Sequence, residues 1–138
     1  MAGLLGASPR EAVATLVASH GTTWVIDRCI EVLTKGEIDG EFLVGLSGQH
    51  ARHVLQGREG GVEGYWPRVW SLRAFLYSWE PRASSVVIAS LKDESWRVRE
   101  MALKVMIRRQ LPVSDSRRAL LARDPIARVR VALERLAP

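Results

Sequence analysis

The stretch Asp93-Glu94-Ser95-Trp96-Arg97-Val98-Arg99 returns 31 residues later as Asp124-Pro125-Ile126-Ala127-Arg128-Val129-Arg130. Both copies begin with aspartate and end with arginine, valine and arginine. A helical unit that recurs at a period of this size cannot bury its apolar face alone, and it does so by stacking against its neighbours. The repeat therefore predicts an all-α protein built from successive antiparallel helix pairs.

The rest of the chain is consistent with one domain over residues 1–138, since 47% of the residues are hydrophobic and can form a core of the usual size. We divide it into an N-terminal helical part (1–56), a glycine-rich loop (57–64) and the repeats (65–138). The longest apolar run, Val86 to Ala89, is far shorter than the ~20 residues that cross a bilayer. The start also lacks a secretory pattern, so we expect a cytoplasmic protein.

The charge of the chain is unevenly distributed. The net charge is +5, with 20 Lys and Arg against 15 Asp and Glu, and the positive excess lies after residue 64. A one-sided positive charge is typical of proteins that bind polyanions. Most of the basic residues are arginine, however, and a GC-rich genome produces the same bias without any such function.

Helix signals mark most of the chain. Ser8-Pro9-Arg10-Glu11 is a capping box that predicts a helix ending at Gly21. Glycine and proline positions predict the remaining helices. These span about 22–36, 39–46, 48–56, 67–79, 81–91, 93–109, 114–122 and 124–138. The loop Gly57–Gly64 holds four glycines in eight residues, and we expect it to be mobile.

The pattern of Asp, four residues, Val and Arg in residues 93–99 and 124–130 resembles HEAT repeats, and Pro67-Arg68-Val69-Trp70 resembles a degenerate earlier copy. The resemblance covers the C-terminal half and barely reaches the first 45 residues. It implies a short right-handed α-solenoid of roughly eight to nine helices. In this family the second helix of each pair lines the concave side.

The family resemblance also implies a structural role for four charged residues. The aspartate lies at the turn within a repeat, and the matching arginine hydrogen-bonds the aspartate of an adjacent repeat. Because charges near a core must be paired, we expect Asp93, Arg99, Asp124 and Arg130 to form a ladder that holds the stack together.

Another set of basic side chains is predicted to face solvent. On a helical wheel of residues 95–109, a solvent-facing stripe of Arg97, Glu100, Lys104 and Arg108 lies opposite the apolar face. Aligning the other second helices and stacking them side by side gives a basic concave face. Its expected members are Arg68, Arg97, Lys104, Arg108, Arg128 and Arg135. Solvated charges on an outer helix face are the alternative interpretation.

Tryptophans accompany this basic half. Trp66, Trp70 and Trp96 are candidates for stacking on bases, or else they are buried in the helical stack. We assign Trp24 and Trp79 to core or subunit contacts.

Catalytic patterns are scarce. His50 and His53 could share a metal ion, but no third ligand has suitable spacing, so we predict no metal site. The single cysteine, Cys29, allows no intramolecular disulfide and falls on an apolar helix face. The glycine loop lacks the Gly-Lys-Ser/Thr ending of a phosphate-binding loop. We expect no cofactor.

Three functions remain open. The first is a non-enzymatic helical-repeat binding module whose basic face takes an acidic protein or a nucleic-acid backbone. The second is a DNA-binding repair enzyme similar to the alkylpurine DNA glycosylases, which are built from HEAT-like repeats and use tryptophans and an aspartate. Against this second function, Asp93 and Asp124 already have predicted roles in the ladder, and Asp115 lies at another predicted helix start. The third is a structural or oligomeric subunit.

Overall fold

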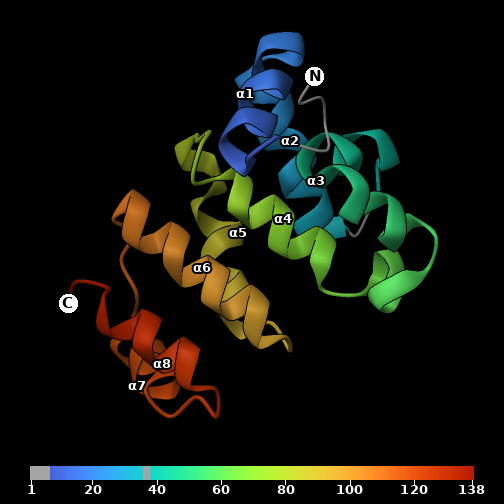
Figure 1. Ribbon diagram of the computed structural model, residues 1–138. Coiled ribbons are helices and arrows are strands. Elements are labelled where there is room, and N and C mark those ends of the chain that lie inside the picture. Colours follow the sequence, from blue (N-terminus) through green and yellow to red (C-terminus); the bar gives the residue numbers. More distant parts are fainter. Residues whose placement is uncertain (1–6, 36–37) are drawn as a thin grey trace.

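A computed structural model describes residues 7–35 and 38–138, and over these ranges the fold is all-helical, with no strand (Figure 1). The α-helices are α1 (Pro9–His20), α2 (Thr22–Lys35), α3 (Gly40–Leu55), α4 (Trp66–Ala74), α5 (Ser84–Ala89), α6 (Trp96–Arg109), α7 (Asp115–Leu121) and α8 (Ala127–Glu134). Three short 3-10 helices, η1 (Arg58–Glu63), η2 (Pro81–Ala83) and η3 (Ser90–Lys92), complete them. None of these helices is both long and apolar enough to cross a membrane.

Helix α1 begins and ends as its sequence predicts. The Ser8 hydroxyl accepts a hydrogen bond from the backbone N–H of Glu11, and the Glu11 carboxylate accepts one from the N–H of Ser8, both at 3.1 Å. These two bonds satisfy N–H groups that the first helical turn leaves without partners. Gly21 follows the helix at φ 90°, where a side chain would be strained.

Helix α3 consists of two helical segments that meet at Gly48. This glycine has φ 53° and ψ −125°, a combination outside the helical region, and its neighbours continue as helix on both sides. The two separate helices predicted for 39–46 and 48–56 are these segments. Ser47, just before the kink, accepts a hydrogen bond from Arg73 of α4.

The glycine-rich loop, predicted to be mobile, forms the 3-10 turns of η1 against α3. Gly57, Gly60 and Gly61 have φ between 66° and 89°, and Glu59 has φ 54°. Left-handed backbone at these positions allows the chain to reverse within a few residues.

The segment predicted as one helix over 81–91 is divided. Helix α5 covers only its middle, and η2 and η3 flank it. The Ser84 hydroxyl donates a hydrogen bond to the carbonyl of Pro81, and Ser90 donates one to the carbonyl of Val86. Serine hydroxyls that bond nearby backbone carbonyls compete with the α-helical pattern.

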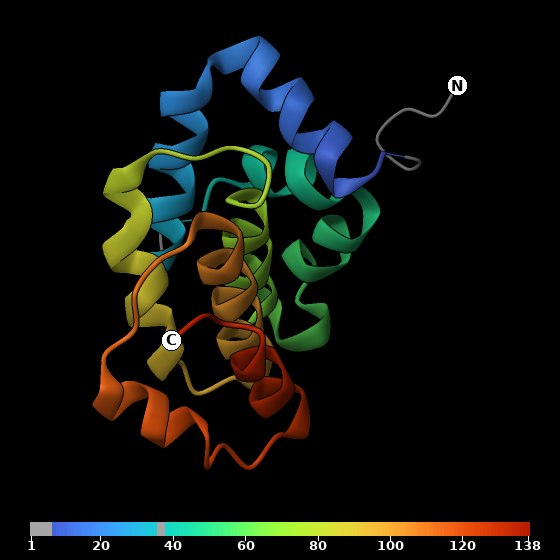
Figure 2. The same ribbon diagram turned by 90° about the vertical axis from the view of Figure 1, so that its left-hand side faces the viewer.

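The order of the helices in space follows their order in the chain. Helix α2 contacts α4, α4 contacts α6, and α6 contacts α8, while α5 lies against α6 and α7 against α8. Figure 2 shows α5 and α7 on one side of α4, α6 and α8. A continuous apolar core runs between the layers from Val13 to Leu136 and includes the fully buried Trp70 and Phe75. The packing therefore places α4, α6 and α8 side by side.

Candidate functional site

Helices α4, α6 and α8 form a row, and two ion pairs of matching geometry connect consecutive helices of this row. Nε of Arg68 lies 2.8 Å from one carboxylate oxygen of Asp93, and its Nη2 lies 3.1 Å from the other. Arg99 repeats both distances with Asp124. Each arginine also donates its remaining Nη1 to a backbone carbonyl, of Gly64 for Arg68 and of Asp93 for Arg99. Bidentate pairs of this kind fix orientation as well as supplying energy.

The position of Arg68 corrects the sequence alignment. We aligned it with Arg97 and Arg128 on the basic face, but it makes the same contacts as Arg99, one repeat of 31 residues earlier. In that register, the residue that matches Arg97 is Trp66. Arg68 therefore belongs with the paired arginines and not with the basic face, because its Nε and Nη2 already donate to the carboxylate of Asp93.

Asp93, Asp124 and Arg130 also make hydrogen bonds with the backbone. Each carboxylate also accepts a backbone N–H two residues ahead, from Ser95 for Asp93 and from Ile126 for Asp124. Both aspartates thus fix the turn before a helix of the row while joining it to the preceding helix. Arg130 donates to the backbone carbonyl of Asp124, and among the described residues no carboxylate forms an ion pair with it.

Arginines and aromatic rings alternate along the start of the row. The guanidinium of Arg97 lies 4.5 Å from the ring centre of Trp96, 5.0 Å from that of Tyr65 and 5.8 Å from that of Trp66. Arg128 lies 5.1 Å from Trp96. Guanidinium groups at these distances are attracted to the ring face. We call these five residues the aromatic–arginine edge.

Trp70 takes no part in this edge. Its side chain is 1% exposed and packs beside Trp66 and His50. Among the three tryptophans considered for stacking on a ligand, Trp70 is therefore a core residue, while Trp66 and Trp96 are only partly buried.

A groove of about 360 Å³ lies between α6 and α8, beside the aromatic–arginine edge. We call it the α6–α8 groove. It is lined by Glu100, Lys104, Ile107, Ala127, Arg128, Val131, Ala132 and Arg135. Lys104, Arg128 and Arg135 were predicted on the basic face, and the aliphatic residues between them form an apolar floor.

Glu100 forms ion pairs with two of the basic residues that line this groove. Its carboxylate lies 2.9 Å from Nε of Arg128 and 3.8 Å from Nζ of Lys104. The Glu100 side chain is only 12% exposed, whereas those of Arg128 and Lys104 are 64% and 43% exposed. A shielded carboxylate thus holds two cations at the groove, while their outer surfaces stay open to solvent.

The two remaining basic residues of the predicted face are exposed. Arg135 lines the groove, and Arg108 lies on α6 outside its lining. Within residues 7–35 and 38–138, no carboxylate forms an ion pair with either of them. Their guanidinium groups can therefore meet a partner without first leaving a carboxylate.

Other chemistry-bearing side chains lie elsewhere. His50 packs between Trp66 and Trp70, and its Nε2 lies 2.9 Å from a carboxylate oxygen of Glu59, while His53 lies beside Gln49. No three His, Cys, Asp or Glu side chains in the part of the chain that the structure describes are grouped to hold a metal ion. Burial raises the pKa of the Cys29 thiol well above its ordinary value, so the thiolate that reacts or binds metals is disfavoured.

Sequence reasoning missed two charged residues. Glu100 was counted as one charge on a solvent-facing stripe, and its central place between two cations depends on how α8 packs on α6. Arg73 was not considered, although it lines a pocket near α1 and α3.

No protein-family model matches this chain, and neither a curated protein nor a solved structure is significantly similar to it.

Proposed function

We propose that the chain is a non-enzymatic, HEAT-like helical-repeat module that binds an acidic protein segment in the α6–α8 groove. The repeat architecture is supported by the two arginine–aspartate pairs, which join α4 to the turn before α6 and α6 to the turn before α8. Equal pairing at equal spacing fits a solenoid, in which each unit makes similar contacts with its neighbour. The row of second helices then forms the binding surface.

The observation that carries the binding proposal is the convergence of three basic side chains on one apolar-floored groove. Lys104, Arg128 and Arg135 come from two neighbouring helices. Val131, on the floor, is 46% exposed. A segment that offers both carboxylates and an apolar side chain matches this surface, because charged groups set orientation while buried apolar area supplies affinity.

Two features favour a protein over a nucleic-acid backbone. Glu100 interrupts the positive charge between Arg128 and Lys104, so the groove lacks the continuous positive track that a regular run of phosphates needs, whereas a peptide can place single carboxylates at the basic side chains. The rings of Trp66 and Trp96 already carry the guanidinium of Arg97, so they are not bare platforms for bases. Single-strand binders instead combine a continuous positive groove with free aromatic faces.

An acidic peptide tests this proposal. We would titrate a peptide of alternating Glu and Leu, with a Lys and Leu peptide as its charge-reversed counterpart, and follow tryptophan fluorescence, since Trp96 borders the groove. We expect only the acidic peptide to bind, and we expect Arg135→Ala to weaken it at least fivefold. Arg123→Ala removes an equal charge from an exposed position outside the groove and should leave the affinity unchanged.

A duplex DNA titration at several salt concentrations separates the two partner classes. A phosphate backbone would give a log affinity that falls with log salt at about −0.9 for each phosphate neutralised. Tighter binding of duplex than of peptide, with such a slope, would reject the protein proposal. So would equal loss of peptide affinity in the Arg135 and Arg123 variants.

A further inference from the structure

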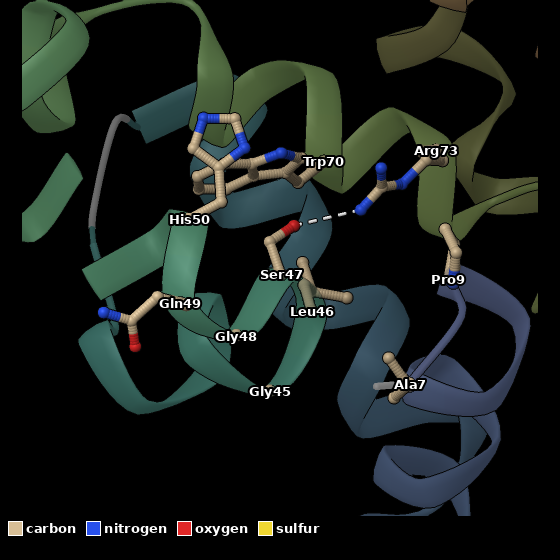
Figure 3. A pocket seen from close by; sticks show the side chains of 11 residues that line it. Ala7, Pro9, Gly45, Leu46, Ser47, Gly48, Gln49, His50, Trp70 and Arg73 are labelled. Carbon is tan, nitrogen blue, oxygen red and sulfur yellow. Dashed lines mark hydrogen bonds between the residues drawn. The ribbon is translucent and has the colours of Figure 1, made fainter. Parts of the chain in front are cut away.

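A second pocket, of about 320 Å³, lies away from the basic face where α1, α3 and α4 meet (Figure 3). The kinked stretch of α3 from Gly45 to His50 forms one wall, Pro9 and Ala12 of α1 form another, and Trp70 and Arg73 of α4 complete the lining. The volume is at the lower end of the range for small-molecule sites.

Arg73 brings a positive charge to this pocket, and the described residues that line it include no carboxylate to compensate that charge. Its Nη2 donates a hydrogen bond of 3.0 Å to the Ser47 hydroxyl, a neutral group. No carboxylate within residues 7–35 and 38–138 forms an ion pair with it. Partial burial lowers the pKa of the Arg73 guanidinium, and Tyr77 acts in the opposite direction to a smaller extent.

Arg68 and Arg99 differ from Arg73 in their partners. Both of those arginines meet a carboxylate through two bonds. Taking a guanidinium even partly out of water costs free energy unless a partner compensates for it. A single serine hydroxyl supplies only part of that compensation, so the arrangement suits a site that a negative ligand completes.

We propose that this pocket binds a small organic anion, with its carboxylate or phosphate held by Arg73 and Ser47 and its apolar body against Ala7 and Pro9. Figure 3 shows Arg73 reaching across the pocket to Ser47, with Trp70 beside them. The guanidinium fork has further N–H groups for an oxyanion, and the Ser47 hydroxyl can supply another donor.

Phenyl phosphate, benzoate and inorganic phosphate are the probes, and benzylamine is the cationic control. Each is titrated into the full-length ¹⁵N-labelled protein at low salt, while amide chemical shifts are followed by NMR. We expect saturable shifts at Gly45, Ser47 and Gly48 with at least one organic anion and none with benzylamine. Comparing the affinities of benzoate and phenyl phosphate shows whether the pocket prefers a carboxylate or a phosphate. Comparing phenyl phosphate with inorganic phosphate shows whether the aromatic ring of the ligand contributes to binding.

Arg73→Met removes the charge and keeps an apolar stem of similar length. We expect it to weaken anion binding at least tenfold and to leave the melting temperature of the ligand-free protein unchanged or higher, because a partly buried charge without a carboxylate partner is gone. Arg52→Met, on the exposed side of α3, removes an equal charge and should bind as the parent does. If Arg73→Met does not fold, Ser47→Ala should still weaken binding severalfold.

Three results would overturn the proposal. The first is the absence of saturable shifts at the pocket with all three anions. The second is equal weakening by the Arg73 and Arg52 variants, which would indicate attraction to the net charge alone. The third is a lower melting temperature for Arg73→Met together with unchanged anion binding, which would make the Arg73–Ser47 bond purely structural.

Discussion

Arg99 holds Asp124 through two hydrogen bonds, of 2.8 and 3.1 Å, across the interface between α6 and the turn that begins α8. The Asp124 side chain is 6% exposed and that of Arg99 is 15% exposed. Arg68 and Asp93 make the equivalent pair one repeat earlier, with somewhat greater exposure. The pair nearer the C-terminus is therefore the better shielded of the two.

Breaking the Arg99–Asp124 pair should destabilise the fold strongly. Arg99→Met leaves the Asp124 carboxylate buried without its guanidinium, and the loss of one partner of a shielded pair costs about 3 kcal/mol. Urea unfolding followed by circular dichroism measures the change. Arg123→Ala, at an exposed position, should stay within about 0.5 kcal/mol. A cost for Arg99→Met as small as that of the control would show that the pair contributes little.

The same pair predicts how stability depends on pH. Burial acts to raise the pKa of Asp124, but hydrogen bonds from Arg99 and from the N–H of Ile126 outweigh it, and the pKa lies below its ordinary 3.8. The unfolded chain therefore binds a proton before the folded protein does. The stabilisation is complete above about pH 5 and is lost as the pH falls below 4 toward the folded-state pKa.

Urea unfolding at pH 6, 5, 4 and 3 tests this. The free energy of unfolding of the parent should fall across the last two steps, and that of Asp124→Asn, which starts lower, should fall less. Parallel pH profiles for the two proteins would contradict the assignment of acid sensitivity to Asp124.

Local signals in the sequence were sufficient for the helices but not for their exact lengths. The capping box at Ser8 and the break at Gly48 involve neighbours in the chain, so propensity and turn chemistry predict them. Helix α4 ends at Ala74, short of the predicted Trp79, because its last turns are set by tertiary contacts. Arg109, for example, donates two hydrogen bonds to the carbonyl of Phe75 at that helix end.

The candidate sites were less predictable because their members meet only through packing. A helical wheel placed Glu100 and Lys104 on one stripe, but it could not show that Arg128 of α8 pairs with Glu100. The position of Arg68 depended on a repeat register that loose sequence similarity left two residues out of step. Arg73 and Ser47 are 26 residues apart in unrelated helices, and no motif joins them.

The C-terminal end of α6 provides a test of backbone strain. Gln110 caps this helix at φ 55° and ψ 46°, a left-handed conformation that costs a residue with a side chain about 1 kcal/mol. Gln110→Gly removes that cost but also makes the unfolded chain more flexible, so we expect a net gain of about 0.5 kcal/mol. Thermal unfolding measures it. Gln110→Ala, which keeps a Cβ, should show no gain, and a gain of equal size would contradict the role of strain.

The role of Glu100 separates binding from stability at the α6–α8 groove. Glu100→Gln keeps the shape of the side chain but removes the charge that holds Arg128 and Lys104. Because both cations then face the groove unpaired, we expect the acidic Glu and Leu peptide to bind at least threefold more tightly. The exposed sides of these ion pairs limit the cost in stability to about 1 kcal/mol. Glu134→Gln, an equal charge change on an exposed position of α8, separates this effect from a rise in net charge. If Glu134→Gln raises the affinity for the peptide as much as Glu100→Gln does, or if Glu100→Gln lowers that affinity, then Glu100 does not restrain the groove's cations.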